Sequence, residues 1–422
     1  MKMTDSKKLF TYAAELYAAQ GIDVNKAMDR LEKIPLSLHA WQGDDVVGFE
    51  HTEHSLTGGC QVTGNYPGRA RNSTELRQDL DEVLKLLPGK NFRVCLQGHE
   101  MDSLASGQDR DSLTVENFSG WLDWASERDL KLDIAPAFYS HPKLDHGLSL
   151  SHPDAAIRRF WIDHGKACRK IAAEFGRRLG SASVCNQWAP DGFKDQPADR
   201  RAPRERLRDS LDEIFREDLP ENQMLDAVES KLFGIGVESY TVGSHDFYLT
   251  YAAKHNKLIC LDTGHFHPTE SIADKLSAIC CQQGRILLHI SRGVRWDSDH
   301  VTILNDDLLD LARESIANDN GKNLFFTLDY FDASINRIAA WVIGARNWQK
   351  ALLIALLEPG DPIRRAEYAG DFTARMAGKE AIKTLPWGII WDHYCEMHGM
   401  PSDAEVLAPI REYEKRVLSA RN

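Results

Sequence analysis

The chain has 422 residues, of which 42% are hydrophobic and 27% are charged. This composition is typical of a folded globular protein and excludes a disordered or low-complexity one. Asp and Glu number 63 against 51 Lys and Arg, a formal net charge of −12, which argues against a nucleic-acid or an anionic-membrane partner. The acidic excess is consistent with solubility and with cation binding, and composition alone does not choose between them.

The N-terminal residues predict an amphipathic helix and no secretion signal. Leu9, Ala13 and Leu16 recur at helical spacing, while Glu15 interrupts the apolar stretch that a signal peptide requires. No apolar stretch reaches the roughly 20 residues of a membrane-spanning helix. The eight cysteines include no Cys-x-x-Cys pair, so we expect reduced thiols and a cytoplasmic protein.

Eight short apolar runs predict strands that are buried on both faces of a sheet. They lie at residues 36–41, 92–96, 130–135, 183–188, 228–233, 258–261, 286–290 and 324–328. Longer stretches with helical spacing lie between them, at residues 73–87, 115–128, 154–179, 204–216, 246–255, 270–281 and 306–317.

This alternation predicts the α/β class. The expected fold is a (β/α)8 TIM barrel with an N-terminal helix over residues 1–335 and a helical C-terminal extension over residues 336–422. We expect the extension to make oligomer contacts. A doubly wound open sheet is the alternative, and it would lack pairing between the first and last strands.

Carboxylates and imidazoles gather at the ends of the last four predicted strands, where a barrel carries its catalytic groups. Each has an ordinary structural explanation when taken alone: a buried carboxylate can belong to an ion pair, and a lone histidine is more often a hydrogen-bonded core residue than a ligand. Their convergence on one rim is the stronger signal. The set is Glu229, Asp262, His265, His289, Asp297, Asp299 and Asp329.

Five carboxylates in one barrel mouth repel one another unless cations are present. Oxygen ligands with some imidazole suit Mn²⁺, Mg²⁺ or Co²⁺, and the lack of thiolates near these residues argues against a structural zinc site. Two divalent ions together with the Lys231 ammonium would balance the five negative charges. The sequence therefore predicts a site for two divalent cations.

Several long motifs resemble the L-rhamnose isomerase family, and the similarity runs from near residue 10 to the C-terminus. They include His39-Ala40-Trp41-Gln42-Gly43-Asp44-Asp45, Trp188-Ala189-Pro190-Asp191-Gly192, Val228-Glu229-Ser230-Lys231-Leu232-Phe233-Gly234, Asp262-Thr263-Gly264-His265-Phe266-His267-Pro268, Arg295-Trp296-Asp297-Ser298-Asp299-His300 and Phe331-Asp332-Ala333-Ser334-Ile335-Asn336-Arg337.

The resemblance implies a cytosolic homotetramer that interconverts L-rhamnose and L-rhamnulose, the first step of L-rhamnose catabolism. It implies Mn²⁺ as the cofactor, with Co²⁺, Zn²⁺ or Mg²⁺ as substitutes. Matched position by position, one ion is held by Glu229, Asp262, His289 and Asp329, and the other by His265, Asp297 and Asp299. Lys231 and Asp329 are the implied catalytic residues, and Trp188, Lys231 and His99 the implied substrate contacts.

One segment departs from the family pattern. Where the second strand is expected to end in Leu-His-Ala-Ile-Tyr, residues 96–100 read Leu-Gln-Gly-His-Glu. If these positions face the methyl group of the sugar, the enzyme would prefer or tolerate a sugar with a hydroxyl there. The alternative is therefore the same isomerase chemistry on another aldose, with L-mannose, L-lyxose and D-allose as candidates.

The mechanism that we expect is a metal-assisted hydride shift, in which Lys231 acts as a fixed cation. The competing enediol route needs a base at C2. A metal-dependent phosphodiesterase on a barrel is a second class of function, and it should show a basic groove. A non-catalytic metal-stabilised scaffold is a third, and it would need neither Lys231 nor tryptophans beside the ions.

Overall fold

Eight parallel strands close into a barrel in the computed structural model, which describes residues 3–50, 62–296, 298–318 and 323–421. Ser37 on the first strand pairs with Thr327 on the last, and this closure excludes the open doubly wound sheet. The order around the barrel is β1-β10-β9-β8-β6-β4-β3-β2. The strands are β1 (Leu36–His39), β2 (Phe92–Gln97), β3 (Lys131–Ala135), β4 (Ser183–Trp188), β6 (Met224–Glu229), β8 (Leu258–Asp262), β9 (Ile286–Ile290) and β10 (Leu324–Leu328).

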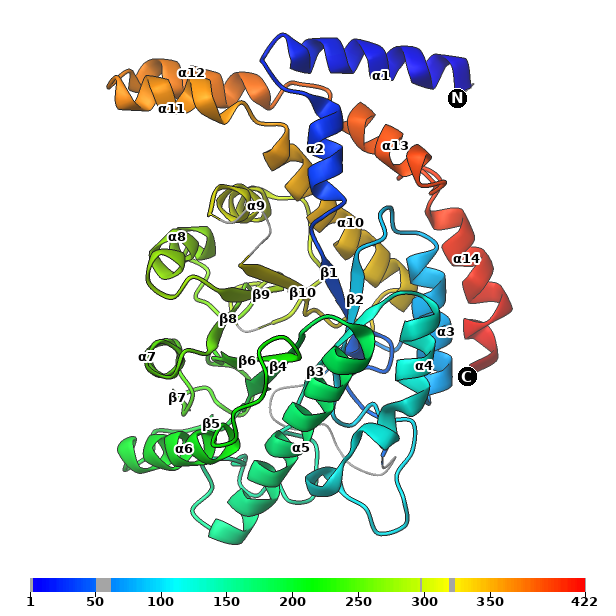
Figure 1. The fold of residues 1–422 in the computed structure, drawn as a ribbon. Helices are drawn as coiled ribbons and strands as arrows, with labels where there is room; N and C mark the ends of the chain where they lie inside the picture. The colour runs from blue at the N-terminus through cyan, green and yellow to red at the C-terminus, as the bar shows by residue number, and fades with distance from the viewer. Residues whose placement is uncertain (1–2, 51–61, 297, 319–322, 422) are drawn as a thin grey trace.

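The helices that follow the strands form the outer layer of the barrel (Figure 1). They are α3 (Ser73–Leu84), α4 (Ser119–Glu127), α5 (Ala155–Leu179), α6 (Arg201–Ile214), α7 (His245–His255), α8 (Ile272–Gln283), α9 (Asp306–Asn318) and α10 (Arg337–Leu356). A small antiparallel pair, β5 (Gly192–Phe193) and β7 (Tyr240–Thr241), lies outside the barrel order. The predicted helix at 115–128 begins as a 3₁₀ turn, Val115–Phe118, and becomes α-helical only from Ser119.

Helix α5 illustrates how local sequence sets these boundaries. The Asp154 carboxylate accepts a hydrogen bond from the backbone N–H of Ala156, which caps the first turn. Phe160, Cys168 and Phe175 recur on one stripe and are buried against the barrel. The helix ends at Gly180, whose φ of 71° is the left-handed conformation that glycine adopts without strain.

The fifth barrel strand differs from its prediction. We expected it at residues 228–233, and it lies at Met224–Glu229. The cause is Asp226. Its charge interrupts the apolar sequence expected of a strand, but in the structure the carboxylate is buried and forms ion pairs. Arg169 donates from Nε and Nη2 to its two oxygens, at 2.7 and 2.9 Å, and Lys257 Nζ lies 2.8 Å from Oδ2. The strand therefore ends at Glu229, so Lys231 lies in the loop beyond it.

Substituting Asp226 by Asn should destabilise the protein strongly, because the Arg169 guanidinium would stay buried without its counter-charge. The expected loss is about 3–5 kcal/mol of unfolding free energy, measured by urea denaturation. The matched control is Asp209→Asn, which breaks a pair with Arg208 at the surface and should cost less than about 0.5 kcal/mol. Equal losses in the two variants would contradict this account of β6.

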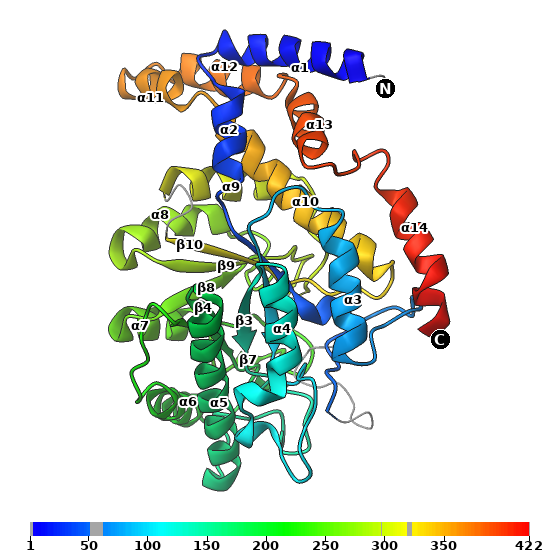
Figure 2. The same ribbon diagram turned by 45° about the vertical axis from the view of Figure 1, so that its right-hand side comes forward.

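Most of the remaining helices lie at the end of the barrel where β1 begins, and the last one lies beside α3 (Figure 2). Helix α10 follows β10 and is largely buried, so it completes the eighth strand–helix unit. The helices outside these eight units are α1 (Met3–Ala18), α2 (Val24–Leu31), α11 (Gly360–Tyr368), α12 (Phe372–Ile382), α13 (Trp387–Met397) and α14 (Leu407–Arg416). Division into two domains between residues 335 and 336 stays a prediction. Within the described ranges, no helix combines the length and apolarity needed to cross a membrane.

Candidate metal centre

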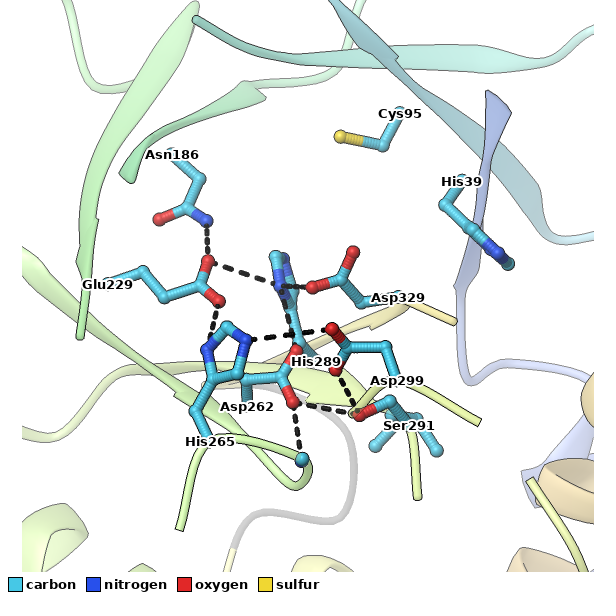
Figure 3. A network of polar contacts seen from close by, with 12 residues as sticks. His39, Cys95, Asn186, Glu229, Asp262, His265, His289, Ser291, Asp299 and Asp329 are labelled. Atoms are coloured by element: carbon cyan, nitrogen blue, oxygen red, sulfur yellow. Dashed lines mark hydrogen bonds and ion pairs between the residues drawn. The ribbon is translucent and has the colours of Figure 1, made fainter. Parts of the chain in front are cut away.

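The carboxyl ends of four consecutive barrel strands bring acidic and imidazole side chains to one point (Figure 3). Glu229 is the last residue of β6 and Asp262 the last of β8, while His289 lies on β9 and Asp329 directly follows β10. Asp262 and His289 are register partners across neighbouring strands. Parallel strands end at the same edge of the barrel, and this is why residues a hundred positions apart meet here.

The first ligand group consists of Glu229, Asp262, His289 and Asp329. One ligand atom from each lies within 4.8 Å of the others. His289 Nδ1 is 2.9 Å from Asp329 Oδ2, 3.2 Å from Glu229 Oε2 and 3.6 Å from Asp262 Oδ2. This is the set that the resemblance implied for one ion, and the fold assembles all four residues.

The second ligand group consists of Asp262, His265 and Asp299, whose ligand atoms also lie within 4.8 Å of one another. His265 Nδ1 lies 2.9 Å from the Ser230 carbonyl oxygen. A carbonyl only accepts, so Nδ1 carries the proton and Nε2 keeps its lone pair for a cation. Asp297, the third predicted ligand of this group, lies outside the described residues, and its assignment stays a prediction. Asp262 instead belongs to both groups.

Backbone and hydroxyl donors fix the shared carboxylate. Gly264 N–H donates to Asp262 Oδ1 at 2.5 Å, and Ser291 Oγ donates to the same oxygen at 2.8 Å and lies 3.2 Å from Asp299 Oδ1. A Cβ at Gly264 would lie 2.5 Å from Asp299 Oδ1 and 2.6 Å from Ser291 Oγ, so this turn requires glycine. Ser291 was not singled out from the sequence, because a serine after a strand carries no distinguishing pattern.

The donor set fits divalent cations. Glu229 Oε1 and Asp262 Oδ2 are buried oxygens without a hydrogen-bond partner among the described residues. Leaving such acceptors unsatisfied is costly, and a cation satisfies them. Asn186 on β4 donates from Nδ2 to Glu229 Oε2 and leaves Oε1 for a ligand. The oxygen-rich composition suits Mn²⁺, Mg²⁺ or Co²⁺.

The environment of the cluster raises the pKa values of some of its groups and lowers those of others. Burial raises the pKa of Asp329 well above its usual value. Burial would also raise the pKa of Glu229, but His289 and His265 outweigh it and hold this pKa at about 2. Burial would lower the pKa of His289, yet its neighbours Cys260, Glu229 and Asp329 raise it well above the ordinary range. In the metal-free cluster, His289 and Asp329 therefore keep their protons to higher pH than a free imidazole or carboxyl group does.

Cation binding should displace these protons, so the affinity for Mn²⁺ should rise with pH. The sign follows from the raised pKa values of His289 and Asp329, since a group that keeps its proton to higher pH competes more strongly with the ion at low pH. Calorimetric titration with Mn²⁺ in two buffers of different ionisation enthalpy would detect the released protons. Equal heats in both buffers and a pH-independent affinity would contradict the assignment.

Lys231 and Trp188 complete one wall of the cavity above the ligands. Lys231 Nζ lies 5.3 Å from the centre of the Trp188 ring, and that ring stacks on His265 with 6.1 Å between centroids. The cavity measures about 280 Å³, and both residues line it together with Glu229, His265, His289, Asp299 and Asp329. A volume of this size accommodates a small polar ligand beside the ions.

His99 lies elsewhere. It is fully buried, and its ring meets Tyr139 edge-on at 5.6 Å; it is absent from the described residues that line the cavity. Gln97, two positions earlier at the end of β2, lines the cavity instead. Alternation along a strand puts neighbouring positions on opposite faces, but His99 lies just beyond β2, so the sequence pattern did not reveal which residue would reach the cavity. A substrate contact by His99 stays a prediction.

The expected lack of thiols near the ligands is wrong. Cys260 on β8 forms a third group with Glu229 and His289, with ligand atoms within 4.8 Å of one another. It is fully buried. Cys260 lies in an apolar run, Leu258–Leu261, and the alternate residues of such a strand face the barrel interior.

Comparisons with known proteins identify the family of this chain. The family model for L-rhamnose isomerase matches residues 4–421. L-rhamnose isomerases of Salmonella typhi and Rhodopirellula baltica are each 51% identical, over 99% of this chain and over 100% and 97% of their own lengths. A solved L-ribulose 3-epimerase structure covers 79% of this chain and 97% of its own at 12% identity, with a TM-score of 0.48. On the full-length identities and the family match, the chain belongs to the L-rhamnose isomerase family.

Proposed function

We propose that the protein interconverts L-rhamnose and L-rhamnulose by aldose–ketose isomerisation, with two divalent cations as cofactor and Mn²⁺ as the preferred ion. The observation that carries the proposal is the coincidence, in one cavity, of two overlapping ligand groups with Lys231 and Trp188. The relatives that share half of its sequence bear the name L-rhamnose isomerase.

The cations would be held by Glu229, Asp262, His289 and Asp329 in one position and by Asp262, His265 and Asp299 in the other, with Asp297 as a further ligand of the second. When bound, they supply Lewis-acid polarisation of the sugar oxygens. The buried ammonium of Lys231 stabilises negative charge that develops on O1 of the sugar. Trp188 gives the sugar a flat apolar wall, and Asp329 is the cavity carboxyl whose pKa is raised by burial.

The isomerisation moves one hydrogen from C2 to C1 and one proton from O2 to O1. We propose that the hydrogen on carbon moves as hydride, since this route needs no base at C2. Turnover in D₂O with mass analysis of the ketose tests the proposal. Little deuterium on C1 is the expected result, because the transferred hydrogen never exchanges with solvent. Substantial deuterium at C1 would point to an enediol route and a protein base.

The sugar preference is tested by ketose formation from L-rhamnose, L-mannose, L-lyxose and D-allose with the Mn²⁺-loaded enzyme. The highest kcat/KM is expected for L-rhamnose. The comparisons give no support to the alternative of another preferred aldose, which rested on residues 96–100. Of that segment, Gln97 lines the cavity, so an L-mannose preference, if measured, would be traced to its amide. The same assay decides against the isomerase if no ketose forms from any of the four.

The other classes of function gain no support. Among the described residues, the cavity is lined by one lysine, several carboxylates and three tryptophans, which is not the basic groove of a phosphodiesterase. A non-catalytic scaffold would not require a buried lysine such as Lys231 in the wall of the cavity. The family match likewise favours the isomerase.

A cytoplasmic homotetramer remains part of the proposal. Helices α11 and α12 contain no buried residue, and they expose Tyr368, Phe372 and Met376 by 83%, 58% and 69%. Apolar side chains exposed to this extent on adjacent helices support contacts with a second copy of the chain. The seven cysteines in the described ranges are free thiols, as expected in a reducing compartment. Light scattering after size exclusion measures the assembly, and a monomeric mass would refute it.

A further inference from the structure

One thiol lies directly beneath the metal centre. Cys260 precedes Asp262 by two positions on β8, so both side chains point into the barrel, one layer apart. Cys260 belongs to the apolar floor of the barrel formed by Val184, Leu225, Ala227, Leu258, Cys260 and Leu287. It is the one member of this floor that offers a metal-ligating atom to the residues above.

The geometry around this thiol is close to that of a three-ligand cation site. Cys260 is the register partner of Glu229, and the ligand atoms of Cys260, Glu229 and His289 all lie within 4.8 Å of one another. Zinc bound to sulfur at about 2.3 Å and to nitrogen or oxygen at about 2.1 Å keeps its ligand atoms about 3.6 Å apart. Shifts on the order of 1 Å would therefore close the group around an ion.

The Glu229 carboxylate of this group is not fully satisfied by hydrogen bonds. Glu229 Oε1 is buried and has no hydrogen-bond partner among the described residues; its nearest recorded charge contact is His265 Nδ1 at 3.0 Å. This nitrogen also lies 2.9 Å from the Ser230 carbonyl, so it does not satisfy Glu229 Oε1 by itself. Glu229 thus presents Oε1 toward His265 at 3.0 Å and Oε2 toward His289 Nδ1 at 3.2 Å.

The three donors differ in character from the group above them. A thiolate is a soft ligand and prefers Zn²⁺ or Cd²⁺, whereas carboxylates with imidazole suit Mn²⁺ and Mg²⁺. We propose that Glu229, Cys260 and His289 form an alternative cation position for a thiophilic divalent ion, one layer deeper than the group of Glu229, Asp262, His289 and Asp329. The inference rests on the proposed metal dependence of the enzyme.

Binding there breaks the S–H bond of Cys260 and forms an S–metal bond, and the proton passes to solvent, so no oxidant or reductant is required. Since Glu229 and His289 serve both positions, an ion in the deeper position excludes one in the upper position. Zn²⁺ would then bind the enzyme tightly but sit away from the cavity. The site would thus discriminate Mn²⁺ from Zn²⁺ by position as well as by affinity.

X-ray absorption on the metal-stripped full-length protein reloaded with Zn²⁺ tests the proposal. The expected result is a sulfur neighbour at about 2.3 Å in the wild type, its loss in Cys260→Ser, and its retention in Cys95→Ser. Cys95 is the matched control, because it is also a buried thiol near the network but belongs to no ligand group. The Mn²⁺-loaded protein should show only nitrogen and oxygen neighbours.

Two outcomes would overturn the inference: a Zn²⁺ spectrum without sulfur in the wild type, or a sulfur neighbour that survives Cys260→Ser. If Cys260→Ser does not fold, the spectra of the wild type and of Cys95→Ser still show whether sulfur binds Zn²⁺ and whether that sulfur belongs to Cys95. Competition supplies a second readout, in which Cys260→Ser should weaken Zn²⁺ relative to Mn²⁺ by at least about tenfold, and an unchanged ratio would contradict the inference. If no divalent ion binds, the proposed function is refuted. If Zn²⁺ binds through nitrogen and oxygen alone, only this inference is refuted.

Discussion

Asp262→Asn is expected to lower kcat by at least about a thousandfold and to remove both cations. Asp262 belongs to both ligand groups, and an amide oxygen carries no negative charge with which to hold either ion. Lewis-acid activation is worth several kcal/mol of transition-state stabilisation, and each 1.4 kcal/mol is tenfold in rate. The loss should therefore exceed that of any variant that disturbs a single group.

The measurement pairs turnover with metal content. Asp329→Asn affects only the first group and Asp299→Asn only the second, so each should retain one ion per subunit where Asp262→Asn retains none. Asp246→Asn, an exposed carboxylate in the first turn of α7, is the matched control and should keep both ions and full activity. Two ions retained in Asp262→Asn would show that this carboxylate does not bridge.

Lys231→Met should lower kcat by about a hundredfold to a thousandfold while leaving both cations in place. The lysine is buried in the cavity wall, 5.3 Å from the Trp188 ring centre, and a protonated amine has no lone pair with which to bind a metal ion. Removing one preorganised donor to developing charge costs roughly this amount in other enzymes. Methionine keeps the length and apolar body of the side chain, so the change isolates the charge.

The expected signature is a fall in kcat with little change in metal content and a smaller change in KM. Lys254→Met, which removes an exposed ammonium from α7, is the matched control and should leave the kinetics unchanged. Lys231→Arg should restore part of the lost activity, because it restores the positive charge. A Lys231→Met enzyme that has lost its cations would assign Lys231 to metal retention, and an enzyme of full activity would refute its role.

The architecture was largely accessible from the sequence because it rests on short-range patterns. Apolar runs marked the strands, helical spacing marked the helices between them, and the carboxyl ends of the last four strands carried the ligands. Glu229, Asp262, His289 and Asp329 meet where the barrel rule puts them. The rule that barrel enzymes carry their catalytic groups at the carboxyl ends of the strands also predicted the position of His265 and Asp299.

The errors of prediction come from interactions between distant segments. The predicted strand carrying Glu229 was wrong by four residues at each end. Its cause is the buried charge of Asp226, which is neutralised by Arg169, 57 residues earlier, and by Lys257. The proximity of the Cys260 thiol to His289 was missed, because it depends on the register of β8 against β9. The burial of His99 against Tyr139 depends on the segment that leaves β2. None of these contacts has a local sequence signal.

The most direct test of metal-dependent L-rhamnose isomerisation by this protein is ketose formation from L-rhamnose. The metal-stripped enzyme is assayed before and after Mn²⁺ is restored. We expect negligible formation of L-rhamnulose without the ion and full turnover once about two Mn²⁺ per subunit are bound. Turnover that is equal with and without Mn²⁺, or no L-rhamnulose from the fully loaded protein, would contradict it.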